Sequence, residues 1–218
     1  MSIITIERRV LEKNDQIAQQ NRDLFRSHGI LAVNVVSSPG AGKTSIIEKT
    51  LETLGGVMKV AVIEGDCQTD FDAQRVARYR VPVVQIVTNG GCHLEAQLVR
   101  NALAAMELEA VELLIIENVG NLVCPANYDL GEAMKIVVLS TTEGEDKPLK
   151  YPAMFRNASV LIINKTDLLP YLAIDLAALR RHALAINPDL VIFETSCTTG
   201  AGIADWCGWL QARRAGSL

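Results

Sequence analysis

Short runs of apolar residues recur along the chain from residue 30 onwards, and a segment with helical spacing follows several of them. Within each run the apolar residues are largely consecutive, which is typical of strands that are buried on both faces. Such strands, when helices join them, form a parallel sheet covered on both sides. The expected strands span residues 30–37, 58–64, 83–87, 111–117, 136–140, 160–164 and 190–194, and the expected helices span 44–54, 70–80, 94–106, 173–186 and 203–213. The pattern therefore predicts an α/β fold with a predominantly parallel seven-stranded sheet and helices on both faces.

The segment 3–29 precedes the first strand and has helical spacing, with apolar residues such as Ile6, Val10, Ile17 and Phe25. Its length suits one long helix or a bent pair that packs on the outside of the core. No repeat, low-complexity tract or linker interrupts the remaining sequence. We therefore expect a single domain over residues 1–218, with residues 1–29 as a helical extension packed on it.

Composition narrows the functional class. The chain has 218 residues, of which 49% are hydrophobic and 21% charged, and this balance is typical of a folded globular protein. A net charge of −4 argues against a dominant surface for nucleic acid or anionic membrane. The N-terminus does not resemble a signal peptide, no apolar run is long enough to cross a bilayer, and the five cysteines look like thiols of a reducing cytosol. We therefore expect a cytoplasmic protein that binds neither nucleic acid nor membrane.

A phosphate-binding loop follows the first expected strand, with the sequence S-S-P-G-A-G-K-T-S over residues 37–45. Gly42, Lys43 and Thr44 match the end of the pattern G-x-x-x-x-G-K-[ST], whereas Ser37 stands where its first glycine usually lies. Small residues let successive backbone N–H groups surround phosphate oxygens, and Lys43 reaches the outer phosphates while the Thr44 hydroxyl binds Mg²⁺. The expected phosphate-contacting residues are Ser38, Gly40, Ala41, Gly42, Lys43, Thr44 and Ser45. An ordinary glycine-rich turn is the alternative, but the strand before it and the helix after it favour a P-loop NTPase.

Carboxylates follow two further strands. Residues 64–72 contain four acidic side chains, and we expect Asp66 near Mg²⁺ and Asp72 orienting or activating water. Asp70 is better explained as a helix N-cap. Glu117 ends an apolar strand three residues before Gly120, as at a Walker-B position, so it is expected to bind Mg²⁺ directly or through water. The Gly120 amide is expected to sense the γ-phosphate, and the expected catalytic set is Lys43, Asp66, Asp72 and Glu117.

Soft metal ligands lie near the same strand ends. Cys92 and His93 are adjacent in sequence, and a thiolate with an imidazole suits Zn²⁺ or Ni²⁺. Either residue alone is more often packing or a helix cap, but Cys124 lies just past the expected switch and supplies a third ligand if the segments meet. A twofold axis would complete such an open set with ligands from a second chain. Cys67 is a weaker candidate ligand, and Cys207 is expected in the core.

The sixth strand ends in N-K-T-D, residues 164–167. The Asp167 carboxylate can accept from the two N–H donors on one edge of guanine, which adenine does not present. Asn164 can bond the other edge and the Lys165 stem can lie over the base. The T-S-C sequence after the seventh strand places Ser196 and Cys197 in the base pocket. These residues predict binding of GTP or GDP with Mg²⁺.

These motifs together resemble one family. The series S-S-P-G-A-G-K-T-S, G-G-C-H, E-N-V-G-N-L-V-C-P, E-G-E-D-K-P and N-K-T-D resembles the HypB family, the nickel-insertion GTPases of [NiFe]-hydrogenase maturation, over residues 30–200. The resemblance implies a SIMIBI-class GTPase that dimerises with nucleotide and couples slow GTP hydrolysis to nickel delivery to the hydrogenase large subunit, alongside a HypA-type metallochaperone. It also implies a Zn²⁺ or Ni²⁺ site at the dimer interface made by Cys92, His93 and Cys124. Lys147 would approach the nucleotide of the partner subunit.

One departure from the family and three rivals remain. Some members begin with a cysteine-rich or histidine-rich stretch, whereas here no cysteine precedes Cys67 and His28 stands alone, so nickel storage is not expected.

The nearest rival is a urease-type or another metal or cobalamin chaperone GTPase. A Cys-Pro-His motif would favour the urease type, but here Cys92 is followed directly by His93. A small-molecule kinase would have no use for N-K-T-D. A metal-binding adaptor with a degenerate nucleotide site would keep metal delivery without Lys43.

Overall fold

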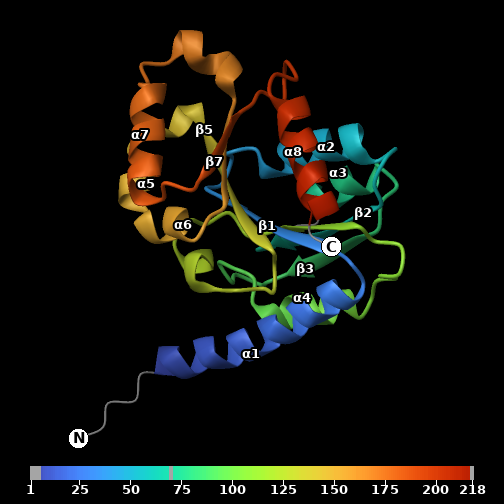
Figure 1. Cartoon of the computed structure of the whole chain (residues 1–218). Coiled ribbons are helices and arrows are strands. Elements are labelled where there is room, and N and C mark those ends of the chain that lie inside the picture. The colour runs from blue at the N-terminus through green and yellow to red at the C-terminus, as the bar shows by residue number, and fades with distance from the viewer. Residues whose placement is uncertain (1–5, 69–70, 217–218) are drawn as a thin grey trace, which may run out of the picture.

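The computed structural model describes residues 6–68 and 71–216, and its centre is a seven-stranded parallel sheet (Figure 1). The strands lie in the order β3-β2-β4-β1-β5-β6-β7, and every neighbouring pair is parallel. They are β1 (Leu31–Ser37), β2 (Val60–Asp66), β3 (Val83–Val87), β4 (Leu113–Glu117), β5 (Met134–Ser140), β6 (Val160–Asn164) and β7 (Val191–Glu194). The predicted α/β fold with seven parallel strands is confirmed.

Each strand is apolar throughout because both of its faces are covered. Along β1, Val33 and Val35 contribute to one core cluster while Ala32 and Val36 contribute to the clusters on the opposite face. Side chains of a strand alternate between the two faces of a sheet, so continuous apolar sequence is what a two-sided core requires. The sheet is therefore the middle layer of three.

Helices form the outer two layers. One face carries α2 (Lys43–Leu54), α3 (Phe71–Ala77) and α8 (Ile203–Gly216). The other carries α1 (Ile6–Ser27) and α4 (Ala96–Leu103) over one half and α6 (Pro152–Arg156) and α7 (Leu176–Ile186) over the other. The chain leaves β1 towards β2 and leaves β5 in the opposite direction towards β6 and β7. A crevice beyond the carboxyl ends of the central strands is the usual ligand position in such sheets.

Three local expectations differ from the structure. The helix expected over 94–106 begins only at Ala96, so Cys92 and His93 lie in the loop before it and do not begin the helix. The helix expected over 70–80 ends earlier, and the N-cap hypothesis for Asp70 lies outside the described residues. The segment after β5, whose charges, glycine and proline indicate a loop, contains a short helix, α5 (Lys147–Lys150). Ahead of that helix, Ser140 and Glu143 cap a single 3-10 turn, Thr141–Glu143, reciprocally, because each side chain accepts from a backbone N–H at the other end of the turn.

The long helix α1 is single, continuous and packed on α4, with its N-terminal part reaching beyond the sheet (Figure 1). Phe25 is buried against the sheet, and the Asn21 side chain donates to the carbonyl oxygens of Ala96 and Leu130 at 3.0 Å each. The Arg22 guanidinium forms an ion pair with Asp129 at 2.7 Å. These contacts come from the C-terminal half of α1, which is consistent with the predicted packed extension.

Replacing Gly131 with alanine should detach α1 and lower the free energy of unfolding by about 2–4 kcal/mol. Gly131 has a φ of +93°, and an added Cβ would lie 2.6 Å from the Ala18 carbonyl oxygen in α1. Gly144→Ala is the matched control, since Gly144 has a φ of +86° but an added Cβ would make only an ordinary contact, with Asp146 Oδ1 at 3.6 Å. It should cost only about 1–2 kcal/mol of backbone strain. Urea unfolding of both variants tests this, and equal losses would contradict the packing of α1 on Gly131.

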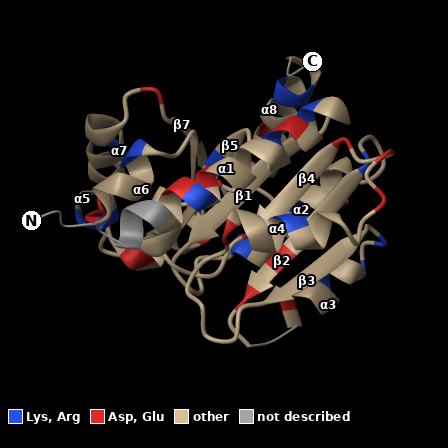
Figure 2. Ribbon diagram, turned by 90° about the horizontal axis from the view of Figure 1, so that it is seen from below, with Lys and Arg blue, Asp and Glu red and all other residues tan. Residues whose placement is uncertain are grey.

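The basic side chains that the structure describes do not form one large positively charged surface. Basic residues are distributed over several helices instead of gathering on one face (Figure 2). Among the described residues, no helix has both the length and the apolar character needed to cross a membrane.

Candidate functional site

A cavity of about 510 Å³ opens at the carboxyl ends of the central strands. Its wall contains residues from four of the expected nucleotide segments: Pro39, Gly40, Gly42, Lys43, Thr44, Ser45, Asp66, Cys67, Asp72, Arg75, Glu117, Val119, Gly120 and Lys165. A larger hollow of about 660 Å³ lies between α1 and the start of β1, but no phosphate-binding loop borders it. The structure thus brings the P-loop, both acidic segments and the N-K-T-D segment to one place.

Protein side chains hold the lysine of the P-loop in place. Lys43 is buried, and its Nζ donates to Ser37 Oγ at 3.1 Å and lies 3.8 Å from Glu117 Oε1. Ser37 is the last residue of β1, in extended backbone that needs no glycine. Its hydroxyl positions the lysine, which explains the serine in place of the motif's first glycine. Gly42, by contrast, has a φ of +101°, and a Cβ there would lie 2.5 Å from Asn164 Nδ2.

Thr44 and Glu117 meet at the cavity floor. Thr44 Oγ1 donates to Glu117 Oε1 at 2.9 Å, and the other Glu117 oxygen is buried beside the carboxyl of Glu64. A hydroxyl and a carboxylate oxygen side by side are ligands that Mg²⁺ accepts. The residues present therefore fit the predicted cation.

Sequence reasoning missed Glu64, which lies beside Glu117. The two residues are register partners on β2 and β4, so their side chains share one face of the sheet. Burial, followed by the neighbouring Glu117, raises the pKa of Glu64 well above its usual range. Glu64 is therefore protonated at neutral pH, and the single charge of Lys43 needs to balance only one carboxylate. Strand order was the only signal that could have paired the two acids.

Arg75 is a second residue that the sequence analysis missed. Its guanidinium lines the cavity, forms ion pairs with Glu48 and with Asp72 Oδ1 at 3.1 Å, and donates to Ser45 Oγ at 3.3 Å. Asp66 and Asp72 both line the cavity, as expected from the sequence. The Asp66 carboxylate also accepts from the Gln68 N–H at 2.8 Å. Arg75 follows Asp72 by three residues on one helix turn, a spacing that could have indicated the pair.

Gly120 borders the P-loop directly. A Cβ on Gly120 would come within 3.1–3.2 Å of three Pro39 atoms, so only glycine lets the backbone of this segment approach so closely. Gly120 and Val119 both line the cavity. The segment predicted to sense the γ-phosphate is thus in contact with the phosphate-binding loop.

The N-K-T-D segment lies behind the P-loop. Lys165 has a left-handed backbone with φ 64°, and its Nζ donates to the Gly40 carbonyl at 2.7 Å. Asn164 is buried, and its Nδ2 donates to the Ala41 carbonyl at 3.1 Å. Asn164 therefore ties the P-loop to β6, in addition to the base contact predicted for it. Strain at a non-glycine residue such as Lys165 is typical of functional loops.

The T-S-C segment completes this region. Ser196 Oγ donates to Asp167 Oδ1 at 2.6 Å, and Cys197 Sγ donates to Asn164 Oδ1 at 3.6 Å. Burial raises the pKa of Cys197 to about 11, so it remains a neutral thiol. Ser196 orients the Asp167 carboxylate that is predicted to read guanine. The structure thus brings Asn164, Asp167, Ser196 and Cys197 together.

Cys92, His93 and Cys124 form a second cluster. One ligand atom from each lies within 4.8 Å of the others, and these three residues are the group in the described chain with metal-site spacing. Cys124 begins a short 3-10 helix, Cys124–Asn127, which follows the Glu117–Gly120 segment. Cys67 lies outside the cluster, and its thiol donates weakly to the Gly91 carbonyl. Cys207 is in the core, as expected.

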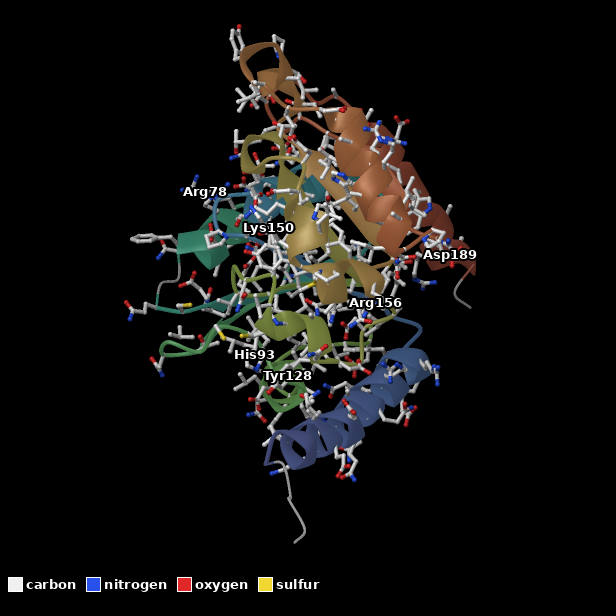
Figure 3. The ribbon with its side chains drawn as sticks, turned by 90° about the vertical axis from the view of Figure 1, so that its left-hand side faces the viewer. Arg78, His93, Tyr128, Lys150, Arg156 and Asp189 are labelled. Atoms are coloured by element: carbon white, nitrogen blue, oxygen red, sulfur yellow. The ribbon has the colours of Figure 1, made fainter. Side chains whose placement is uncertain are left out.

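The His93 ring is held by its surroundings. Its centroid lies 4.0 Å from that of the Tyr128 ring. Figure 3 labels these two neighbouring side chains. Nδ1 faces Cys92 Sγ at 3.5 Å, while Nε2 lies 3.9 Å from Glu95 Oε1. A carboxylate near the second ring nitrogen is the usual support of a metal-binding histidine. Burial lowers the pKa of His93, which leaves its imidazole neutral and able to bind a metal at neutral pH.

Nickel binding should release protons and weaken as the pH falls. The hydrogen bond with Cys124, together with burial, raises the pKa of Cys92, so the thiol carries a proton at neutral pH that a metal must displace. The affinity should fall about tenfold per pH unit for each displaced proton. Calorimetry of Ni²⁺ binding in buffers of different ionisation enthalpy measures the proton release. Cys124→Ala should abolish Ni²⁺ binding, and the proton release with it, whereas Cys67→Ala should leave both unchanged. An Ni²⁺ affinity that does not depend on pH would contradict binding by thiolates.

Lys147 lies at the start of α5. Its Nζ is 3.4 Å from Glu143 Oε2 and 5.5 Å from the centre of the Tyr151 ring. These contacts are within one chain, so the approach of Lys147 to a partner's nucleotide remains a prediction.

Comparisons with known proteins agree with this arrangement. The family model for the CobW/HypB/UreG nucleotide-binding domain matches residues 31–194. The hydrogenase maturation factor HypB of Azotobacter vinelandii is 50% identical over 97% of this chain and 70% of its own length. The crystal structure of HypB from Helicobacter pylori in complex with nickel has a TM-score of 0.89 and 38% identity, covering 94% of this chain and 96% of that one.

A more distant structure supports the fold class alone. The signal recognition particle 54 kDa protein of Aeropyrum pernix in complex with GDP has a TM-score of 0.60 at 15% identity, covering 85% of this chain and 49% of that one. The fold is therefore that of the SIMIBI class of P-loop proteins. On the strength of the family model and of the extended identity to its curated members, the chain belongs to the HypB family.

Proposed function

We propose that this chain is a GTPase that couples nucleotide-dependent dimerisation to nickel delivery into [NiFe]-hydrogenase. The observation that carries the proposal is the short link between the cluster of Cys92, His93 and Cys124 and the cavity-lining Gly120. Cys124 follows Gly120 by four residues, and Gly120 contacts the P-loop. Soft ligands that flank a phosphate-sensing segment are suited to a metal site whose geometry depends on the bound nucleotide.

The nucleotide half of the proposal assigns roles to the cavity residues. Thr44 and Glu117 would hold Mg²⁺ with help from Asp66, and the ion would offset charge on the phosphate oxygens. Lys43 would neutralise the outer phosphates, and Asp72 would orient the attacking water. Hydrolysis would be slow, because Asp72 is paired with Arg75 and the proposed site needs a partner subunit to be complete.

The metal half requires a second chain. Three ligands leave a metal site open, whereas structural sites usually have four. A homodimer with its twofold axis near the cluster would close the site and bring Lys147 towards the partner's nucleotide. The cargo would be Ni²⁺, with Zn²⁺ as a competing occupant. Delivery would take place in the cytoplasm with a HypA-type metallochaperone and the hydrogenase large subunit precursor as partners.

The test measures hydrolysis, mass and metal binding together. In the absence of a phosphate-acceptor substrate, phosphate release with GTP should exceed that with ATP by at least about 100-fold. The reason is that adenine lacks the two N–H donors from which the Asp167 carboxylate would accept hydrogen bonds. Light scattering should show more dimer with a non-hydrolysable GTP analogue than with GDP, and the Ni²⁺ affinity should differ between the two states. Equal rates with ATP and GTP, or identical mass and affinity in both nucleotides, would contradict the proposal.

A urease-type or cobalamin-chaperone GTPase is the alternative. The matching family model includes CobW and UreG beside HypB. Cys92 is followed directly by His93, without the intervening proline of a Cys-Pro-His motif, which favours the hydrogenase assignment. Activation of purified hydrogenase precursor, compared with apo-urease, separates the two.

A further inference from the structure

A buried chain of hydrogen bonds and one ion pair connects the two segments that carry the cysteine and histidine ligands. Asn118 and Asn34 are 1% and 0% exposed, so their polar side chains depend entirely on protein partners. Asn118 Oδ1 accepts from the backbone N–H of Leu94 and of Val119, each at 3.0 Å. One oxygen atom therefore holds both the loop that contains His93 and the segment that borders the nucleotide cavity.

The direction of each link is determined by its neighbours. Two backbone N–H donors face the same Asn118 atom, so that atom must be the oxygen. Asn118 Nδ2 then donates to Asn34 Oδ1 at 3.2 Å, and Asn34 Nδ2 donates to Glu132 Oε1 at 3.0 Å. The chain thus ends on a Glu132 oxygen that accepts, and neither amide can turn over without breaking at least two hydrogen bonds.

The same chain reaches the other ligand segment through Lys135. Lys135 Nζ lies 3.9 Å from Glu132 Oε1 and donates to the carbonyl oxygens of Pro125, Ala126 and Tyr128 at 2.8–3.2 Å. These carbonyls belong to the turn that begins at Cys124. The loop of Cys92 and His93 is therefore held at one end of the buried chain and the turn of Cys124 at the other.

We propose that Asn118 is the positioning residue through which the nucleotide-sensing segment 119–120 and the metal-ligand loop 92–94 act on each other. This inference rests on the proposed GTPase function. If segment 119–120 moves towards a γ-phosphate, the Val119 N–H must either leave Asn118 Oδ1 or carry the side chain with it. Either movement alters the bond from Leu94, the residue next to His93. Coupling of this kind is reciprocal, so a bound metal also changes the affinity for the nucleotide.

A second connection provides the matched control. Asn121 Nδ2 donates to the Cys92 carbonyl at 3.2 Å, and Asn121 Oδ1 accepts from the Val123 N–H at 2.8 Å. This bond also joins the segment after Gly120 to the ligand loop, but it lies at the surface and does not involve the Val119 N–H. Asn118→Ala and Asn121→Ala therefore make the same chemical change at two rival links.

The experiment measures the Ni²⁺ affinity of each variant with GDP and with a non-hydrolysable GTP analogue. We expect the wild-type affinities in the two states to differ at least about fivefold. In Asn118→Ala the two Ni²⁺ affinities should differ by less than about twofold. Asn121→Ala should keep the wild-type ratio between the two affinities, even if both affinities change. A ratio retained in Asn118→Ala, or lost only in Asn121→Ala, overturns the inference while leaving the proposed function intact. A ratio of one in the wild type overturns both.

A measurement on the unmodified protein guards against misfolding of Asn118→Ala. Amide hydrogen exchange should show that replacing GDP with the GTP analogue changes the protection of the Leu94 N–H at least about tenfold, and that Ni²⁺ changes the protection of the Val119 N–H. The Ala96 N–H, which donates to Asn14 Oδ1 in α1 at 2.8 Å and not to the Asn118 chain, serves as the reference amide. A change in the protection of only one of the two amides, Leu94 or Val119, would overturn the coupling through Asn118.

Discussion

Replacing Lys43 with alanine should lower the rate of GTP hydrolysis by about 10²–10³-fold, the usual cost of removing one charge-stabilising donor from a reacting phosphate. Lys43 is the basic side chain of the P-loop, and its Nζ lies between Ser37 Oγ and Glu117 Oε1 at the cavity floor. The variant also leaves the buried Glu117 carboxylate without its cation. Nucleotide affinity should therefore fall together with the rate.

Lys49→Ala is the matched control for Lys43→Ala. Lys49 lies on the same helix, α2, but its Nζ pairs with Glu52 at the surface. A single-turnover assay with GTP, combined with thermal unfolding of each variant, separates catalysis from stability. An unchanged hydrolysis rate in a folded Lys43→Ala protein would show that the P-loop does not bind the reacting phosphates, as in a metal-binding adaptor.

Replacing Asp167 with asparagine should lower the affinity for GTP by at least about 100-fold and transfer it to XTP. The Asp167 carboxylate is oriented by Ser196 Oγ at 2.6 Å. A carboxylate accepts from both N–H donors on the edge of guanine, whereas an asparagine amide accepts from one and presents a donor towards the other. Xanthine has a carbonyl in place of that second donor and therefore complements asparagine.

Competition binding of GTP, XTP and ATP to the wild type and to Asp167→Asn provides the measurement. Asp175→Asn is the control, because Asp175 caps α7 through the Ala178 N–H and asparagine caps a helix equally well. Its affinity for GTP should not change. Equal affinity of Asp167→Asn for GTP and XTP would mean that Asp167 does not contact the base.

Much of the fold follows from local pattern. The seven strands are apolar at consecutive positions because both faces are covered, and this property is visible in segments such as 113–117 without any tertiary information. The P-loop residues are contiguous in sequence, so their chemistry and their place after β1 could also be predicted. The N-K-T-D segment is equally local, since β6 ends at Asn164.

Other features could not be predicted, because they depend on which strands are neighbours. Glu64 and Glu117 share one face only because β2 pairs with β4 in that register. Glu64 appears in the sequence as one acid among four, and its proton is a consequence of burial beside Glu117. The segment after β5 folds into a 3-10 turn, Thr141–Glu143, which Ser140 and Glu143 cap reciprocally, followed by the short helix that carries Lys147. A charged segment with glycine and proline otherwise indicates a loop.

The sequence by itself determined that this protein has a parallel sheet and a phosphate-binding loop, and it predicted a guanine-recognition segment, since each is written in consecutive residues. The tertiary structure decided that Cys92 and His93 meet Cys124, and that one oxygen of Asn118 holds both Leu94 and Val119. Ligand residues far apart in the chain come together through strand order. A buried amide bridges two loops only where packing excludes water, and neither condition can be read from spacing along the chain.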